Sequence, residues 1–113
     1  MDLINKKTLV KLKNKNIGNN RLVKSIDKLI QQIEKANWKN ESDIQIDRPD
    51  ADRVHNDGFY FFDIHIHRTM ILISIDQYEA RVIWAGSHDD YTSKFRNNKK
   101  TIEKWLRSNN EIK

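Results

Sequence analysis

The middle of the chain carries apolar runs rich in β-branched and aromatic residues, separated by short polar breaks. These runs are Phe59–Ile66, Met70–Ile75 and Ala80–Gly86. Both alternating faces of the first run begin apolar, which predicts a strand that is covered on both sides. Because the links between runs are short, we expect neighbouring strands to pair antiparallel. The pattern therefore predicts a small antiparallel β-sheet.

The segment before these runs has helical periodicity. Apolar residues recur at three- and four-residue spacing from Leu22 to Ile33, which predicts an amphipathic helix with its apolar side in the core. We expect Asn20 to cap this helix. A first strand is expected at Leu3-Ile4, followed by a short helix with Asn5 as its N-cap.

The stretch that links the long helix to the sheet is polar. Trp38 is expected to anchor the end of the helix, and Pro49 argues against a regular helix within residues 41–50. Asp57-Gly58 is a turn signal directly before the first sheet run.

After the sheet the pattern becomes helical again. Ser87 is followed by His88-Asp89-Asp90, which is typical of a helix start, and Lys99–Ser108 is an amphipathic segment. The whole chain is expected to form one α+β domain, residues 1–113. N-terminal helices would pack on the small antiparallel sheet, and a C-terminal helix would lie in a basic tail, residues 96–113.

Composition narrows the class of protein. The chain has 113 residues, which is enough for one modest core, and a formal net charge of +5. This charge favours a polyanionic partner such as RNA, although a solvated lysine-rich surface explains the same residues. The candidate RNA-binding residues in the tail region are Lys94, Arg96, Lys99 and Lys100. The chain has no cysteine and no apolar run of about 20 residues, so we expect a cytoplasmic protein without disulfides or a membrane span.

His88 and Tyr91 are the first candidates for chemistry. They are three residues apart and share a face if Ser87 caps a helical turn. A histidine there can move protons near neutral pH, and a tyrosine can orient a phosphate. The alternative is a simple helix start in which Tyr91 covers the core.

Arg68 and Arg81 lie in or near the predicted strands. A fixed guanidinium at either position could hold a phosphate through two hydrogen bonds and stabilise developing negative charge. The alternative is an edge arginine whose aliphatic stem covers apolar surface.

A metal site is a third possibility. His65 and His67 have a spacing that suits two ligands on one face of a strand, but no third ligand is fixed by spacing. We therefore expect no metal and place these histidines at a hairpin tip. The further ligands of a metal nuclease would be His55, Asp50, Asp52 and Asp63.

Four segments, taken together, resemble HigB-family toxins of bacterial toxin–antitoxin systems in their order and spacing. They are residues 36–40 (ANWKN), 49–54 (PDADRV), 61–64 (FFDI) and 86–91 (GSHDDY). The resemblance extends roughly from Leu3 to Tyr91 and leaves the C-terminal tail outside.

This resemblance implies a RelE-like α+β fold and an enzyme that cuts mRNA on translating ribosomes without a metal or other cofactor. It also implies a helix-turn-helix antitoxin, HigA, that silences the toxin, and a complex of the two that binds operator DNA. The implied reaction is attack by a ribose 2′-hydroxyl on the neighbouring phosphate. His88 or Tyr91 would move protons, and Arg68 and Arg81 would stabilise the phosphorane.

The chain departs from the family pattern in three places. His65-Ile66-His67 replaces a Gly-Gly-Asn type turn, which suggests a longer or differently shaped turn. The usual basic positions fall at Met70 and Ile83, two residues after Arg68 and Arg81, and a shift of two keeps a strand side chain on the same face. The alternative function is a catalytically weak or inactive module that binds RNA or protein on the same fold.

Overall fold

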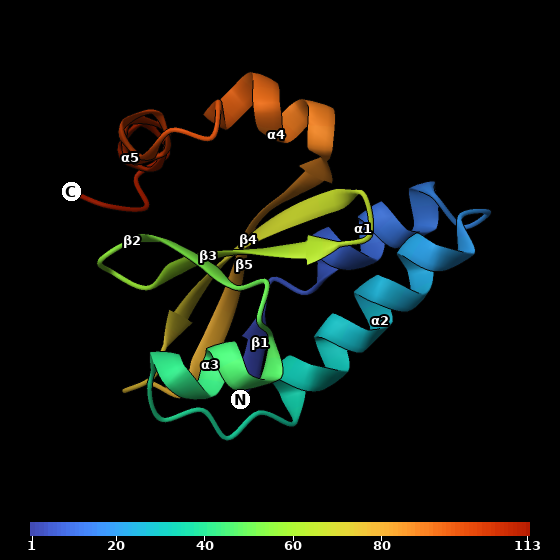
Figure 1. The fold of residues 1–113 in the computed structure, drawn as a ribbon, viewed down its shortest axis with the longest axis horizontal. Helices are drawn as coiled ribbons and strands as arrows, with labels where there is room; N and C mark the ends of the chain where they lie inside the picture. Colours follow the sequence, from blue (N-terminus) through green and yellow to red (C-terminus); the bar gives the residue numbers. More distant parts are fainter.

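A five-stranded sheet in the order β1-β5-β4-β3-β2 lies between two groups of helices (Figure 1). The computed structural model describes residues 1–113. The strands are β1 (Asp2–Ile4), β2 (Asp52–His55), β3 (Phe59–Ile64), β4 (His67–Ser74) and β5 (Glu79–Ser87). The helices are α1 (Lys7–Lys15), α2 (Asn20–Glu34), α3 (Glu41–Asp47), α4 (His88–Phe95) and α5 (Lys99–Ser108).

The strand pairing confirms the predicted α+β fold. Strands β2 to β5 pair antiparallel in sequence order, and only β1 is parallel to its neighbour, β5. Strand β2 was not expected, and it adds an edge next to β3. No helix of the chain is both long and apolar enough to cross a membrane.

The sheet has a hydrophobic core on each face, as the pattern of β3 predicts. Tyr60 and Phe62 face α1, α2 and α3 in the larger core. Phe59 and Phe61 face α4 and α5 in the smaller core. Because side chains alternate along a strand, a strand such as β3 with apolar residues on both faces requires helices on both sides.

The long helix α2 is confirmed, although its cap is one residue earlier than expected. The side chain of Asn19 accepts a hydrogen bond from the backbone N–H of Leu22 at 3.2 Å. The predicted cap of α1 is wrong: Asn5 has a φ of 63°, and its side chain donates to the backbone oxygen of Val82 at 2.7 Å. Asn5 therefore ties the start of α1 to β5.

The prediction of no regular helix within residues 41–50 is also wrong. Helix α3 fits between Asn40, which caps it by accepting from the Asp43 N–H at 3.0 Å, and Pro49, which comes after its end. Trp38 is buried as expected, and its indole N–H donates to the Asp47 carboxylate at 2.8 Å.

Candidate active site

The end of the β3–β4 hairpin and the start of α4 enclose a pocket of about 590 Å³. Most of its lining residues are polar, and they come from β2, the hairpin, α4 and the α4–α5 link. The lining residues are Asp52, Asp63, His65, Ile66, His67, Arg68, His88, Tyr91, Thr92 and Asn97. We call this the hairpin pocket.

The sheet register brings α4 to the hairpin. His67 at the start of β4 pairs with Ser87 at the end of β5, so α4 begins beside the hairpin tip. The His88 N–H donates to the backbone oxygen of Ile66 at 3.2 Å. Ser87 caps α4 as predicted, because its hydroxyl accepts from the Asp90 N–H at 3.1 Å.

The hairpin turn is short. Ile64 pairs with His67, which leaves only His65 and Ile66 as the turn, and His65 has a φ of 61°. The sequence suggested a longer or differently shaped turn, and the structure has a tight two-residue turn, so the turn is not longer. The histidines lie at the hairpin tip, as expected.

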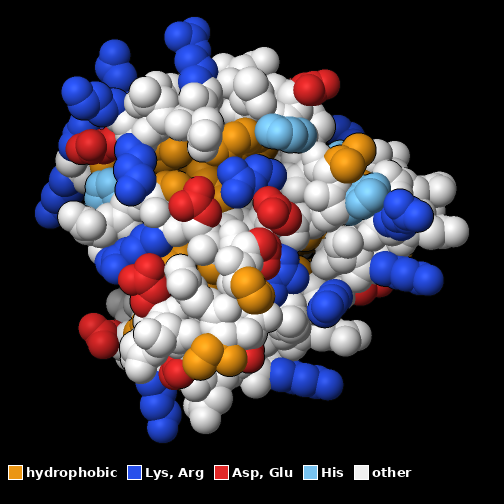
Figure 2. All heavy atoms as spheres, viewed as in Figure 1, with side chains coloured by type: hydrophobic (Ala, Val, Ile, Leu, Met, Phe, Trp, Pro, Cys, Tyr) orange, Lys and Arg blue, Asp and Glu red, His pale blue; other side chains and the backbone are white.

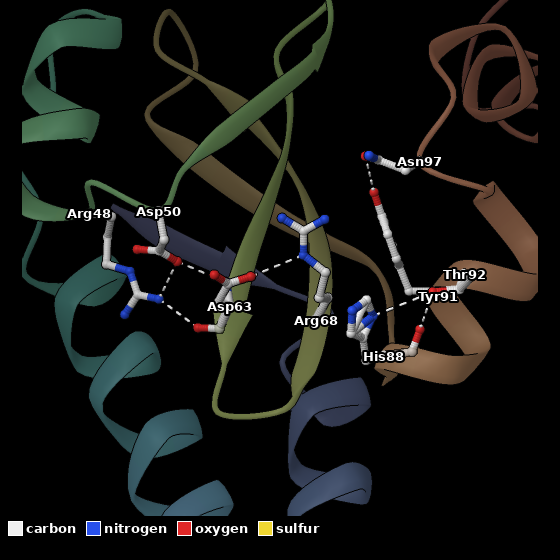
Figure 3. A network of polar contacts seen from close by, with 8 residues as sticks. All are labelled: Arg48, Asp50, Asp63, Arg68, His88, Tyr91, Thr92 and Asn97. Carbon is white, nitrogen blue, oxygen red and sulfur yellow. Dashed lines mark hydrogen bonds and ion pairs between the residues drawn. The ribbon is translucent and has the colours of Figure 1, made fainter.

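Arg68 lies above the aromatic floor of the hairpin pocket. Its guanidinium carbon lies 4.5 Å from the ring centroid of Tyr91 and 5.1 Å from that of Phe61. Its Nε–H donates to the carboxylate of Asp63, the cross-strand neighbour, at 3.0 Å. The two terminal nitrogens make no hydrogen bond within the protein, so they remain available to an anion (Figure 3).

A partly buried ion pair, Arg48 with Asp50, fixes the strand that carries Asp63. Arg48 donates to the Asp50 carboxylate and to the backbone oxygen of Asp63, both at 2.7 Å. The same carboxylate accepts from the Asp63 N–H at 2.8 Å (Figure 3). Burial alone would raise the pKa of Asp50, but the hydrogen bonds from Arg48 and the Asp63 amide outweigh it and hold this pKa below its ordinary value.

His88 is exposed at the first position of α4, with its ring 5.9 Å from that of Tyr91. The hydroxyl of Thr92 donates to the His88 backbone oxygen at 3.0 Å and lies 3.4 Å from His88 Nδ1. Because the Thr92 hydroxyl donates its proton to the His88 backbone oxygen, it can act toward Nδ1 only as a hydrogen-bond acceptor. This favours the tautomer with the proton on Nδ1 and a free lone pair on Nε2.

Tyr91 forms the floor of the hairpin pocket. It is buried, and its ring meets Phe61 edge-on at 4.9 Å. Its hydroxyl donates to the side-chain oxygen of Asn97 at 3.0 Å. The buried ring and tethered hydroxyl make Tyr91 a fixed support for Arg68.

His67 is a further histidine of the hairpin pocket, and its Nδ1 is buried without a hydrogen-bond partner. Burial, together with the neighbouring His65, lowers the pKa of His67, and the opposing effect of Asp90 is smaller. His67 is therefore a neutral group near pH 7.

The structure brings together three of the four predicted catalytic residues, Arg68, His88 and Tyr91. Arg81 is not with them. It pairs with Ile4 and Leu72 near the opposite end of β5, six residues before Ser87 or roughly 20 Å along the strand.

The predicted RNA-binding residues are all exposed on α4, α5 and the link between them, and none forms an ion pair. These residues are Lys94, Arg96, Lys99 and Lys100. Figure 2 shows Lys and Arg side chains around the upper left edge, where Figure 1 places α5.

The possible metal ligands do not form one site, although Asp52, Asp63, His65 and His67 all line the hairpin pocket. His55 lies at the far end of β2 with its ring 5.8 Å from that of Phe59, away from the hairpin tip. No group of three or more His, Asp or Glu side chains is arranged to hold a metal ion.

Sequence reasoning did not predict Thr92 or Asn97 in the hairpin pocket, and it named Asp63 only as a possible metal ligand, not as the partner of Arg68. Asp63 could have been found as the cross-strand neighbour of Arg68 if a two-residue turn had been assumed. Thr92 could have been found one helical turn after His88. Asn97 gave no local signal, because the αL residues Arg96 and Asn97 that return the chain to the pocket have no clear sequence signature.

The fold and pocket define a small α+β protein that presents one fixed arginine and two exposed histidines, His65 and His88, at a hairpin end. Residues 16–94 match the family model of the HigB toxin, described as the RelE-like toxic component of a toxin–antitoxin system. The chain belongs to the HigB toxin family. The matched region contains the hairpin and α4 up to Lys94, and α5 lies outside it. The match begins at residue 16, so it also leaves out β1 and α1, although the resemblance was expected to begin near Leu3. The comparison with curated proteins gave no match.

Proposed function

We propose that this toxin is a metal-independent endoribonuclease that cuts mRNA, acts on translating ribosomes and thereby inhibits translation. The observation that carries the proposal is the state of Arg68. Arg68 lines the hairpin pocket together with His88, its two terminal nitrogens make no hydrogen bond within the protein, and Asp63 and the Tyr91 ring fix its orientation. A planar guanidinium held in this way suits a phosphate that gains negative charge during reaction.

The proposed reaction uses the 2′-hydroxyl of the RNA itself. Nε2 of His88 takes the hydroxyl proton, the 2′-oxygen bonds to phosphorus, and the bond from phosphorus to the 5′-oxygen breaks. The products are a 2′,3′-cyclic phosphate and a 5′-oxygen that takes up a proton from solvent. Arg68 stabilises the equatorial oxygens of the phosphorane, and the ribosome positions the mRNA for in-line attack.

Expression in bacteria tests this function. Wild-type protein should arrest growth and produce new mRNA ends, and co-expression of a helix-turn-helix antitoxin encoded beside it should restore growth. His88→Ala should relieve both effects while the purified variant keeps its fold, because only the proton acceptor is lost. If growth arrest and mRNA cleavage persisted in the variant, His88 could not be the proton acceptor.

One observation favours a second candidate function, a binding module that does not cleave RNA. Arg81 is distant from the hairpin pocket, so Arg68 is the single arginine there. Under this alternative, the wild type yields no cleavage products. Charge reversal at Lys99 and Lys100 should then abolish binding to RNA or protein.

A further inference from the structure

A second groove lies behind the hairpin pocket, on the opposite face of the sheet. It has a volume of about 540 Å³ and is lined by one side of α1 and one residue of β5. The lining residues are Thr8, Lys11, Leu12, Asn14, Lys15 and Ala85. We call it the α1 groove.

The α1 groove and the hairpin pocket are back to back on the same pair of strands. Ala85 pairs with Thr69, and the next pair is Gly86 with Arg68. Ala85 packs against the core on the α1 side, whereas Arg68 points toward α4. The strands end two residues beyond Ala85, so the groove floor is about 7 Å from the end of the sheet.

The rim between the two hollows is the hairpin tip. His65 is exposed there, and Ile66 is 61% exposed although it is apolar. An imidazole and an aliphatic side chain at an open edge suit contact with the faces of bases.

The α1 groove carries positive charge that no acidic side chain neutralises. Lys11 and Lys15 are exposed at i, i+4 spacing on α1, and neither makes an ion pair or hydrogen bond. Helix α1 contains no acidic residue. Figure 2 shows Lys and Arg side chains on the right of this face, where Figure 1 places α1 and α2.

We propose that the α1 groove binds the single-stranded RNA segment next to the scissile phosphate. The strand leaves the hairpin pocket over His65 and Ile66, and Lys11 and Lys15 hold its backbone phosphates. A protein partner fits less well, because protein interfaces need an apolar centre and Leu12 and Ala85 are the only hydrophobic residues here. This inference rests on the proposed function, which places RNA in the hairpin pocket.

Binding of uncleavable RNA to the full-length protein tests the inference. The probes are 2′-O-methyl oligoribonucleotides, a trinucleotide that fills only the hairpin pocket and a single strand of about 12 nucleotides. The test variant is Lys11→Ala with Lys15→Ala. The matched control is Lys24→Ala with Lys28→Ala on α2, which removes two exposed, unpaired lysines at the same spacing outside the groove.

The test variant should bind the long probe more weakly, and the slope of log Kd against log salt should fall by about 1.4, or about 0.7 per lysine. Trinucleotide binding and thermal stability should not change, and the control should keep most of the wild-type slope. If both double variants lost the same affinity for the long probe, the inference would be overturned, since net charge alone would then explain binding. Unchanged RNA binding with weaker binding of the antitoxin would also overturn it.

These results are separate from the test of the proposed function. The inference can fail in binding while the wild type still cleaves mRNA. Absence of cleavage together with absence of trinucleotide binding would instead reject the proposed function.

Discussion

Arg68 offers the sharpest test of the hairpin pocket, because its role in catalysis is expected to exceed its role in stability. Asp63 and the Tyr91 ring fix the guanidinium, and its terminal nitrogens are free. Removal of a single fixed donor to transition-state charge costs about 10²- to 10³-fold in rate. We therefore expect Arg68→Ala to lose about 10³-fold, and Arg68→Lys to lose about 10²-fold because the charge stays and the planar fork is lost.

The effect of the same substitution on stability should be small. The ion pair with Asp63, whose side chain is 55% exposed, is worth about 0.2–1 kcal/mol. Each cation–π contact, with Tyr91 and Phe61, is worth about 0.5–1 kcal/mol. Arg68→Ala should therefore lower the free energy of unfolding by no more than about 3 kcal/mol.

The assay is single-turnover cleavage of mRNA on purified ribosome complexes, with thermal unfolding measured on the same protein. Arg81→Ala is the matched control, because Arg81 lies on the neighbouring strand and outside the hairpin pocket. It should cleave at the wild-type rate. Wild-type cleavage by folded Arg68→Ala would refute the assignment of phosphate binding to Arg68.

Three further predictions concern the side chains that support the site. Asp63→Asn should lower kcat about tenfold with little change in KM, because the substitution weakens the contact that orients Arg68 but leaves the guanidinium donors in place. A rise in KM with unchanged kcat would contradict this positioning role. Asp50→Asn should cost about 2 kcal/mol at neutral pH. The pKa of Asp50 lies below its ordinary value of 3.8. The difference in unfolding free energy between wild type and variant should therefore be complete above pH 3.8 and should shrink as the pH falls through the folded-state pKa. A difference that stays unchanged in acid would exclude a stabilising role for the ionised Asp50 carboxylate. Thr92→Val should reduce kcat several-fold and shift the His88 nitrogen resonances in NMR toward the other tautomer, and unchanged resonances would refute the assigned tautomer.

The sequence was sufficient for elements whose local and tertiary requirements agree. Helix α2 has one apolar side, and strand β3 has apolar residues on both faces. Each can bury these side chains in only one arrangement, so the sequence pattern was enough to predict the helix and the strand. Ser87 likewise capped α4 as expected, since the cap and the acids after it act within one helical turn.

The remaining features depend on contacts between distant segments. Asn5 was expected to cap α1, but the open carbonyl of Val82 on β5 provides its side chain with a different partner. Pro49 was read as excluding a helix, although it only limits where α3 ends. Arg81 was grouped with Arg68 because both precede the usual basic positions, and only the strand register shows that they lie at opposite ends of the sheet.

The central claim is that the RNA is cleaved in the hairpin pocket by attack of its own 2′-hydroxyl on the neighbouring phosphate. The most direct measurement maps the cleavage position in a ribosome-bound mRNA and then replaces the nucleotide before it with its 2′-deoxy form. We predict that wild-type protein cleaves the ribose substrate to a 2′,3′-cyclic phosphate and leaves the deoxy substrate intact. Cleavage of the deoxy substrate at the same position would contradict the account.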